Sequence, residues 1–185
     1  MASRGRALGP PGSVRAMDVE TAIRTRRTHK AFEAKPLRRE ELTALLELAR
    51  FAPNHHLTEP WRFRVVGPET FERLVAAGGS NEREKLARAP TLIVASAKQS
   101  GDAHQDREDV LATACAVYVV LLTAHARGLA SYWRTPKLLA TPEGRTAVGL
   151  PDGEEFVALI HLGVPSGSRP AKERKPPADY VEFLP

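Results

Sequence analysis

Two stretches of the sequence are the most informative about the fold. They are Arg26-Arg27-Thr28-His29-Lys30 and, further along, Ala52-Pro53-Asn54-His55-His56-Leu57-Thr58-Glu59-Pro60-Trp61. The first stretch places cations and a hydroxyl at the end of a predicted helix, and such groups bind phosphate. The second is a loop rich in Pro, His and Asn that leads directly into a predicted strand, as expected beside a planar ring. Together the two stretches indicate a flavin.

The cations follow a short amphipathic helix predicted over residues 17–26, which has acidic side chains in its first turn and apolar ones at helical spacing. Arg26, Thr28 and Lys30 can converge on one phosphate monoester, because Arg offers a planar fork, Lys a point charge and Thr a hydroxyl donor. The alternative is that the cations only complement the helix C-terminus and remain solvated.

The order of the motifs resembles the FMN-dependent nitroreductase family. Arg-x-Thr-x-Lys-x-Phe, from Arg26 to Phe32, is followed by a helix and then by Ala-Pro-Asn-His and Pro-Trp-Arg-Phe. Residues 129–136, after a long apolar stretch, and residues 157–165, which close with Leu-Gly-x-Pro, agree with the same family. Each motif is degenerate, but four in this order are fairly specific. The resemblance runs from about Val19 to Pro165 and is closest to short, single-domain members.

This resemblance implies a set of FMN-binding residues. The phosphate and the pyrimidine end would be held near the first motif, the loop would contact the cofactor, and the strand after the long helix would line the ring. In that order the residues are Arg26, Arg27, Thr28 and Lys30; Asn54 and His55; Trp133, Arg134 and Thr135. Lys172 and Arg174 resemble a second phosphate clamp of longer members. No side chain is predicted to be catalytic, because the chemistry takes place on the flavin.

The implied fold is α+β, with a central, mainly antiparallel sheet flanked by helices. Hydrophobic periodicity and the Gly and Pro positions predict the individual elements. Helices are expected at residues 39–51, 68–77, 110–126 and 142–148, a short charged helix or lid at residues 80–88, and strands at residues 61–66, 91–97, 130–134 and 157–165. The acidic run from Asp102 to Asp109 is expected to stand at a helix start, where the macrodipole favours anions.

Composition divides the chain into three parts. Residues 1–16 are rich in Gly, Pro, Ser and Arg and are expected to be a flexible tail, residues 17–165 form the flavin domain, and residues 166–185 form an arm. The arm has too little apolar sequence to build a core. In the family such an arm lies on the other subunit and FMN lies in the dimer interface, which implies a homodimer with exchanged arms. The alternative is an arm that packs on its own subunit or is disordered.

Composition also excludes several functions. The net charge of +5 over 185 residues is partly due to arginines in the first sixteen residues, so the body is nearly neutral and carries no nucleic-acid footprint. The apolar run at residues 110–126 is shorter than the ~20 residues that a membrane span needs. The histidines lack metal-binding spacing. We expect a cytoplasmic protein without a metal site or disulfide, in which the single cysteine, Cys115, is a buried apolar side chain.

The predicted function is an oxidoreductase that passes electrons from NADH or NADPH, through FMN, to a nitro compound, a quinone or an activated double bond by a ping-pong mechanism. One alternative is a protein of the same fold that sequesters FMN, a deazaflavin or a haem-like ligand without turnover, and another is a structural dimer with an empty pocket. Glu59 stands where the family usually has Gln, and we expect it to pair with Arg62 or Arg64.

Overall fold

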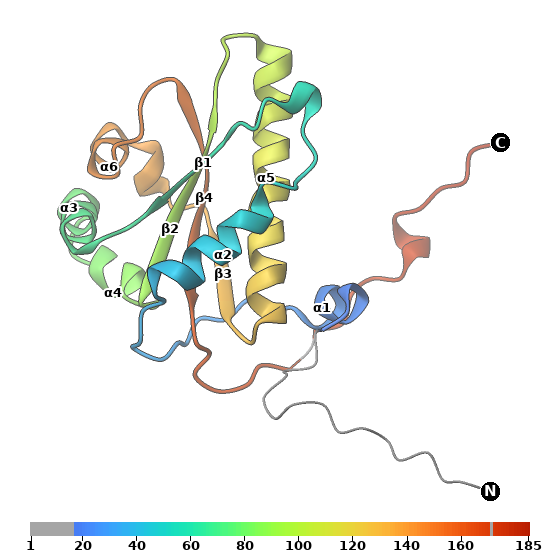
Figure 1. Cartoon of the computed structure of the whole chain (residues 1–185), viewed down its shortest axis with the longest axis horizontal. Helices are drawn as coiled ribbons and strands as arrows, with labels where there is room; N and C mark the ends of the chain where they lie inside the picture. The colour runs from blue at the N-terminus through green and yellow to red at the C-terminus, as the bar shows by residue number, and fades with distance from the viewer. Residues whose placement is uncertain (1–16, 171) are drawn as a thin grey trace, which may run out of the picture.

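A four-stranded antiparallel sheet forms the centre of the molecule (Figure 1). The computed structural model describes residues 17–170 and 172–185, so the predicted tail at residues 1–16 lies outside the described residues. The strands are β1 (Trp61–Val65), β2 (Thr91–Lys98), β3 (Ala130–Arg134) and β4 (Glu154–Gly163). Their order is β1-β2-β4-β3, and each neighbouring pair is antiparallel. The predicted α+β class is confirmed.

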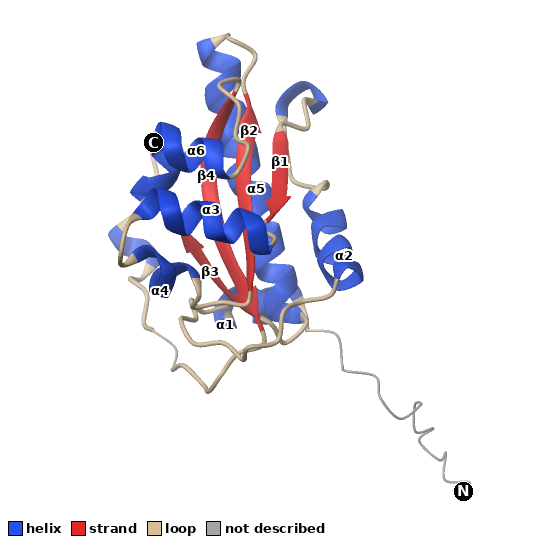
Figure 2. Ribbon diagram, turned by 90° about the vertical axis from the view of Figure 1, so that its left-hand side faces the viewer, coloured by secondary structure: helices blue, strands red, loops and turns tan. Residues whose placement is uncertain are grey.

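Helices cover both faces of the sheet (Figure 2). One face carries α3 (Pro68–Gly78), α4 (Glu82–Leu86) and α6 (Pro142–Ala147). The other carries α5 (Ala103–Ala126), beside which α2 (Arg39–Ala49) and α1 (Val19–Thr25) pack. Short 3-10 turns are η1 (His55–Leu57), η2 (Lys137–Ala140) and η3 (Pro177–Asp179).

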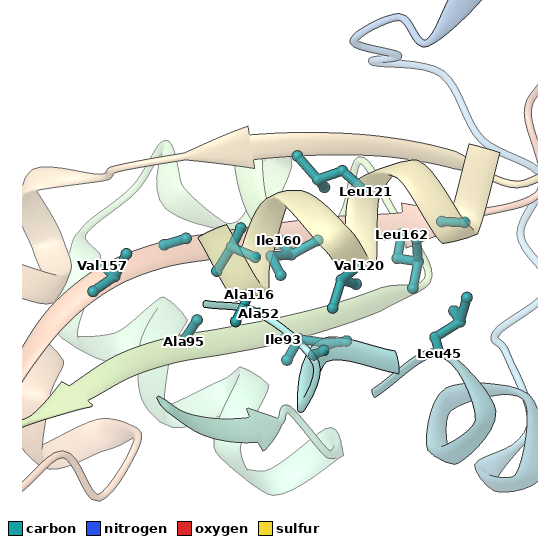
Figure 3. Close-up of a cluster of buried hydrophobic side chains, with 14 of the residues drawn as sticks. Leu45, Ala52, Ile93, Ala95, Ala116, Val120, Leu121, Val157, Ile160 and Leu162 are labelled. Atoms are coloured by element: carbon teal, nitrogen blue, oxygen red, sulfur yellow. The ribbon is translucent and has the colours of Figure 1, made fainter. Parts of the chain in front are cut away.

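The core consists of two clusters, one on each face of the sheet. Because successive strand residues point to opposite faces, Ile93 and Ala95 pack toward α5 and α2 (Figure 3), whereas Leu92 and Val94 pack toward α3, α4 and α6. Burial on both faces explains why β2 is a continuous apolar run in the sequence rather than an alternating one.

Helix α5 begins at Ala103, within the acidic run that was predicted to stand at a helix start, and the apolar stretch from Val110 forms its later turns. Its first turns are polar, and Asp102 caps them by accepting hydrogen bonds from the backbone N–H groups of His104 at 3.0 Å and Gln105 at 2.9 Å. By length and composition alone α5 could cross a membrane. However, Val117 and Val120 are fully buried against the sheet, as in the core helix of a globular domain.

Cys115 is exposed, which contradicts the prediction that it is buried. The apolar side chains of α5 surround the whole helix, so sequence periodicity could not tell which side faces the sheet. Leu111 and Tyr118, on the same side of α5 as Cys115, are 58% and 38% exposed. The neighbouring α1 exposes Val19 and Ile23. We call these exposed side chains of the two helices the α1–α5 apolar face.

The C-terminal arm leaves the body beside α1 and runs outward (Figure 1). It begins where the backbone N–H of Ser166 donates to the carbonyl of Ala31 at 3.2 Å. Towards its end Tyr180, Phe183 and Leu184 are 71%, 93% and 80% exposed, so these apolar side chains make little contact with their own chain.

Candidate functional site

The segment Arg26–Lys30 is held between the end of α5 and the edge strand β3. Helix α1 ends at Thr25, whose hydroxyl lies 2.8 Å from Nε2 of His125. The chain then becomes extended, and Thr28 forms a β-bridge with Ser131 while the N–H of His29 donates to the Ser131 carbonyl at 3.1 Å. These contacts place the predicted phosphate-binding residues along the start of β3.

The predicted cations converge on one cavity of about 220 Å³, which we call the cation cavity. It combines the N-terminal motif with the start of the C-terminal arm. Its lining consists of Arg26, Arg27, Thr28, Lys30, Arg169, Pro170, Lys172 and Arg174. Arg169 was not among the predicted site residues, although it lies three residues before Lys172 in a Pro- and Gly-rich stretch. Among the described residues no carboxylate lines this cavity.

The cations in this cavity lack acidic partners within the described part of the chain, where every ion pair involves other basic residues. Arg26 lies 6.0 Å from the centre of the Tyr118 ring, and Lys30 lies 5.6 Å from that of Tyr132. Arg27 donates to the carbonyl of Arg24 at 2.9 Å, but its buried Nε has no partner among the described residues. Contacts with aromatic rings and backbone carbonyls thus hold these positively charged side chains close to one another.

Burial and the arginines of the cavity both lower the pKa values of two neighbouring histidines. Burial, and then Arg169 and Arg27, lower the pKa of His29 below its usual value. Burial, and then Arg26 and Arg27, lower the pKa of His125 in the same direction. Burial disfavours any charged group, so only the smaller effect of Arg26, Arg27 and Arg169 on these pKa values reflects a positive potential that would favour an anion.

The end of β3 borders a second cavity, of about 410 Å³, which we call the β3 cavity. The predicted ring-lining residues are divided here: Trp133 packs against the α5 core cluster, Arg134 lines the β3 cavity, and Thr135 is exposed. The remaining lining comes from α3, α4 and the turn after β3, and comprises Ala77, Gly78, Glu82, Lys85, Pro136, Lys137, Leu138 and Thr141.

The Asn54–Glu59 loop lies at the other end of α5. Asn54 holds the loop together, because its side chain accepts from the N–H of Glu59 at 3.0 Å and donates to the carbonyl of Ala52 at 3.2 Å. His55 Nδ1 lies 2.8 Å from Oε2 of Glu108, and its ring stacks on His56 at 3.8 Å. His56, Leu57 and Glu59 adopt positive φ angles of 54°, 52° and 43°, a strained backbone of the kind found at binding loops.

Within a single chain, the Asn54–Glu59 loop lies far from the cation cavity. Glu108 contacts the loop and His125 contacts α1, and the two residues are roughly 25 Å apart along α5 at a rise of about 1.5 Å per residue. Asn54 and His55, predicted to share a cofactor with Arg26 and Lys30, are therefore at the opposite end of the helix (Figure 1).

Glu59 does not form the predicted ion pair. Arg64 pairs instead with Glu154 on β4, at 2.8 Å, and Arg62 donates to the backbone carbonyl of Glu59 at 3.1 Å. The prediction was wrong because β2 pairs with both β1 and β4, so the side chains of Arg64 and Glu154 meet over Ser96 of β2, which the local sequence does not reveal. Within the described part of the chain, no group of three or more His, Cys, Asp or Glu side chains is arranged to hold a metal ion.

The fold and the cation cavity define an α+β protein whose cavity suits a phosphorylated ligand. The chain belongs to the nitroreductase family, whose model matches residues 23–164. It is 30% identical over 173 residues to the Bacillus subtilis protein named putative NAD(P)H nitroreductase YfhC, covering 85% of this chain and 89% of that protein. The similarly named YdjA of Escherichia coli K12 is 29% identical over 161 residues, which cover 80% of this chain and 87% of YdjA.

Solved structures agree on the fold. The nitroreductase-like family protein from Bacillus cereus superposes with a TM-score of 0.81 at 26% identity, covering 91% of this chain and 96% of that one. A nitroreductase with bound FMN from Desulfitobacterium hafniense DCB-2 has a TM-score of 0.70 at 20% identity, covering 88% and 96% of the two chains. The predicted family is therefore confirmed.

Proposed function

We propose that this protein is an FMN-dependent oxidoreductase that passes electrons from NADH or NADPH to a nitro compound, a quinone or an activated double bond. The observation that carries the proposal is the cation cavity, a cluster of arginines and lysines that no carboxylate of the described residues lines, in a chain of the nitroreductase family. The names of its relatives and the FMN bound to one structural neighbour support the same conclusion.

The residues of the cation cavity fit the phosphate of FMN. Arg26, Arg169 and Arg174 offer planar forks for phosphate oxygens, and Lys30 and Lys172 add point charges. A phosphate dianion would relieve the repulsion between these side chains. Because Thr28 lies beside Ser131, the rest of the cofactor would extend along β3 toward Arg134. When bound, FMN supplies hydride acceptance and electron transfer, and the protein orients it.

The separation of the two halves of the predicted site supports a homodimer. The Asn54–Glu59 loop can reach a flavin in the cation cavity only from another copy of the chain, and twofold symmetry would place the loop of each copy at the site of the other. The α1–α5 apolar face provides an exposed surface for this contact, and exposed apolar surface of this kind marks interfaces. The arm, with Tyr180 and Phe183 exposed, is proposed to lie on the second copy.

Replacing Leu111 by Glu is therefore expected to dissociate the dimer and lower the FMN content. Leu111 is 58% exposed in one chain, so the substitution should cost the isolated fold little, but in the dimer it would bury a charge twice. We expect the dimer Kd to rise at least about tenfold, measured by sedimentation at micromolar protein. Val65→Glu, at a side chain that is 48% exposed on β1, is the matched control. Equal sedimentation of both variants and the wild type would rule out this interface.

Kinetics test the enzymatic proposal directly. If NADPH and the acceptor use the same open side of the cofactor, the first product leaves before the second substrate binds, and double-reciprocal plots should give parallel lines. NADPH should also bleach the yellow protein under anaerobic conditions. A yellow protein that no nicotinamide reduces would instead be the sequestering protein, and intersecting lines would contradict a shared site.

A further inference from the structure

Another cavity, of about 210 Å³, lies where the Asn54–Glu59 loop meets the end of β2 and the first turns of α5. We call it the loop cavity. Its lining consists of Thr58, Pro60, Lys98, Gln99, Ser100, Gln105 and Asp109. None of these residues lines the cation cavity or the β3 cavity, so the proposed phosphate site makes no use of them.

The loop cavity contains a buried carboxylate with an unused acceptor. Asp109 on α5 is 4% exposed, and its Oδ1 accepts hydrogen bonds from the hydroxyl of Thr58 at 2.6 Å and from Nε2 of Gln105 at 3.0 Å. No group among the described residues donates to the other oxygen, Oδ2. An unpaired oxygen on a buried carboxylate is destabilising, so a fold that keeps one beside a cavity is suited to a ligand that donates to it.

A cationic donor and an apolar ring complete the lining. Lys98, the last residue of β2, is exposed and forms no ion pair with the described residues. Its backbone N–H donates to the carbonyl of Pro60 at 2.8 Å, which fixes the end of β2 against the loop. Pro60 is buried and adds its apolar ring to the lining.

These groups are complementary to one edge of an adenine base. On that edge the N6 amine is a donor and N7 is an acceptor, which match a carboxylate oxygen and an ammonium group. An apolar ring such as that of Pro60 suits the flat face of the base. The volume of about 210 Å³ is below the roughly 300–1,000 Å³ of sites that enclose a drug-sized ligand, so it suits one ring system rather than a whole dinucleotide.

We propose that the loop cavity binds the adenine base of NADH or NADPH, with the N6 amine donating to Oδ2 of Asp109 and N7 accepting from Lys98. The proposal rests on the proposed function, since a nicotinamide dinucleotide is the source of adenine considered. The loop that borders this cavity is the one proposed to reach the flavin of the second copy. Because nicotinamide and adenine are at opposite ends of the dinucleotide, a reductant bound at that flavin would extend past the loop toward the cavity.

The test compares NADH with reduced nicotinamide hypoxanthine dinucleotide, in which a carbonyl oxygen replaces the N6 amine while N7 and the nicotinamide are unchanged. The Kd of each comes from the dependence of the rate of anaerobic flavin reduction on dinucleotide concentration, with the full-length, FMN-loaded protein. The wild type should bind the hypoxanthine form at least about tenfold more weakly, because the carboxylate of Asp109 would then face an acceptor. The oxidised dinucleotides, which cannot reduce the flavin, give the same comparison by calorimetry.

Two variants assign the contacts. The side-chain oxygen of Asp109→Asn can keep the hydrogen bonds from Thr58 and Gln105 while its amide donates into the cavity, so this variant should bind the hypoxanthine form at least as tightly as NADH. Lys98→Met should weaken both dinucleotides by a similar factor, because both have N7. Asp152→Asn, at an exposed carboxylate that does not line the loop cavity, is the matched control and should discriminate as the wild type does.

Equal affinity of the wild type for the two dinucleotides would overturn the adenine site while leaving the proposed function standing. A flavin that neither dinucleotide reduces would overturn the proposed function, and calorimetry with the oxidised dinucleotides would still decide whether the cavity discriminates adenine from hypoxanthine. The comparison of ligands on the wild type needs no variant, so it decides the matter even if Asp109→Asn does not fold.

Discussion

Replacement of Arg26 by Ala is expected to weaken FMN binding by about 1.5–3 kcal/mol, which is about 10- to 150-fold in Kd. The guanidinium lines the cation cavity and is held over Tyr118, so it would meet the phosphate as a charge-assisted donor. Because Arg26 forms no ion pair with the described residues, its loss should leave the fold intact. Titration of the apoprotein with FMN, followed by fluorescence, measures the effect.

Arg24→Ala supplies the control for this experiment. Arg24 lies in the last turn of the same helix, pairs with Glu20 at 2.8 Å and does not line the cation cavity. An exposed pair of this kind contributes little, so FMN affinity should hardly change. Raising the salt concentration should weaken FMN binding to the wild type more than to Arg26→Ala. Full FMN occupancy of Arg26→Ala at sub-micromolar flavin would show that the phosphate binds elsewhere.

The stability of the protein is expected to fall by about 2 kcal/mol between pH 7 and pH 5 on account of His161 alone. This histidine on β4 is fully buried beneath Tyr132, and both ring nitrogens lack partners among the described residues. Burial, and then the charges of Arg134 and Arg88, lower the pKa of His161 to about 3. The unfolded chain takes up a proton near pH 6.5, whereas the folded chain does not until about pH 3. Stability is therefore lost as the pH falls through this window.

Urea unfolding at both pH values, with wild type and His161→Leu, measures this contribution. Leucine fills the site without titrating, so the variant should lose about 2 kcal/mol less than the wild type between pH 7 and pH 5. Contributions from carboxylates are common to both proteins and cancel. His104→Gln, at a side chain that is 84% exposed, is the control and should follow the wild type. Identical pH dependence of His161→Leu and wild type would contradict a neutral, buried imidazole.

Local sequence patterns were sufficient to predict most of the helices and strands of the fold. The leucines of residues 39–51 recur on one side of a helix, and the structure has α2 at Arg39–Ala49. Glycine after the long apolar run predicted the end of α5, where Gly128 has a φ of 75°. The acidic run from Asp102 indicated the start of α5, where Asp102 caps the helix, whereas hydrophobic periodicity detected only the turns from Val110 onward.

The convergence of the predicted cations was also foreseeable from sequence, because Arg26, Thr28 and Lys30 are close together in the chain. The Lys-x-Arg pair at Lys172 and Arg174 lines the same cavity. That these residues bind FMN remains a prediction.

The sequence by itself thus determined the family, most of the elements and the cationic character of the segment from Arg26 to Lys30, since each depends on local sequence patterns. Only the tertiary structure decided how distant elements meet. Packing places Glu82 of α4 beside Arg134 of β3, and strand pairing gives Glu154, not Glu59, to Arg64. The length of α5 separates the Asn54–Glu59 loop from the cation cavity, and the side of α5 that faces the sheet leaves Cys115 exposed. These outcomes depend on distances and helix rotations that no local pattern encodes.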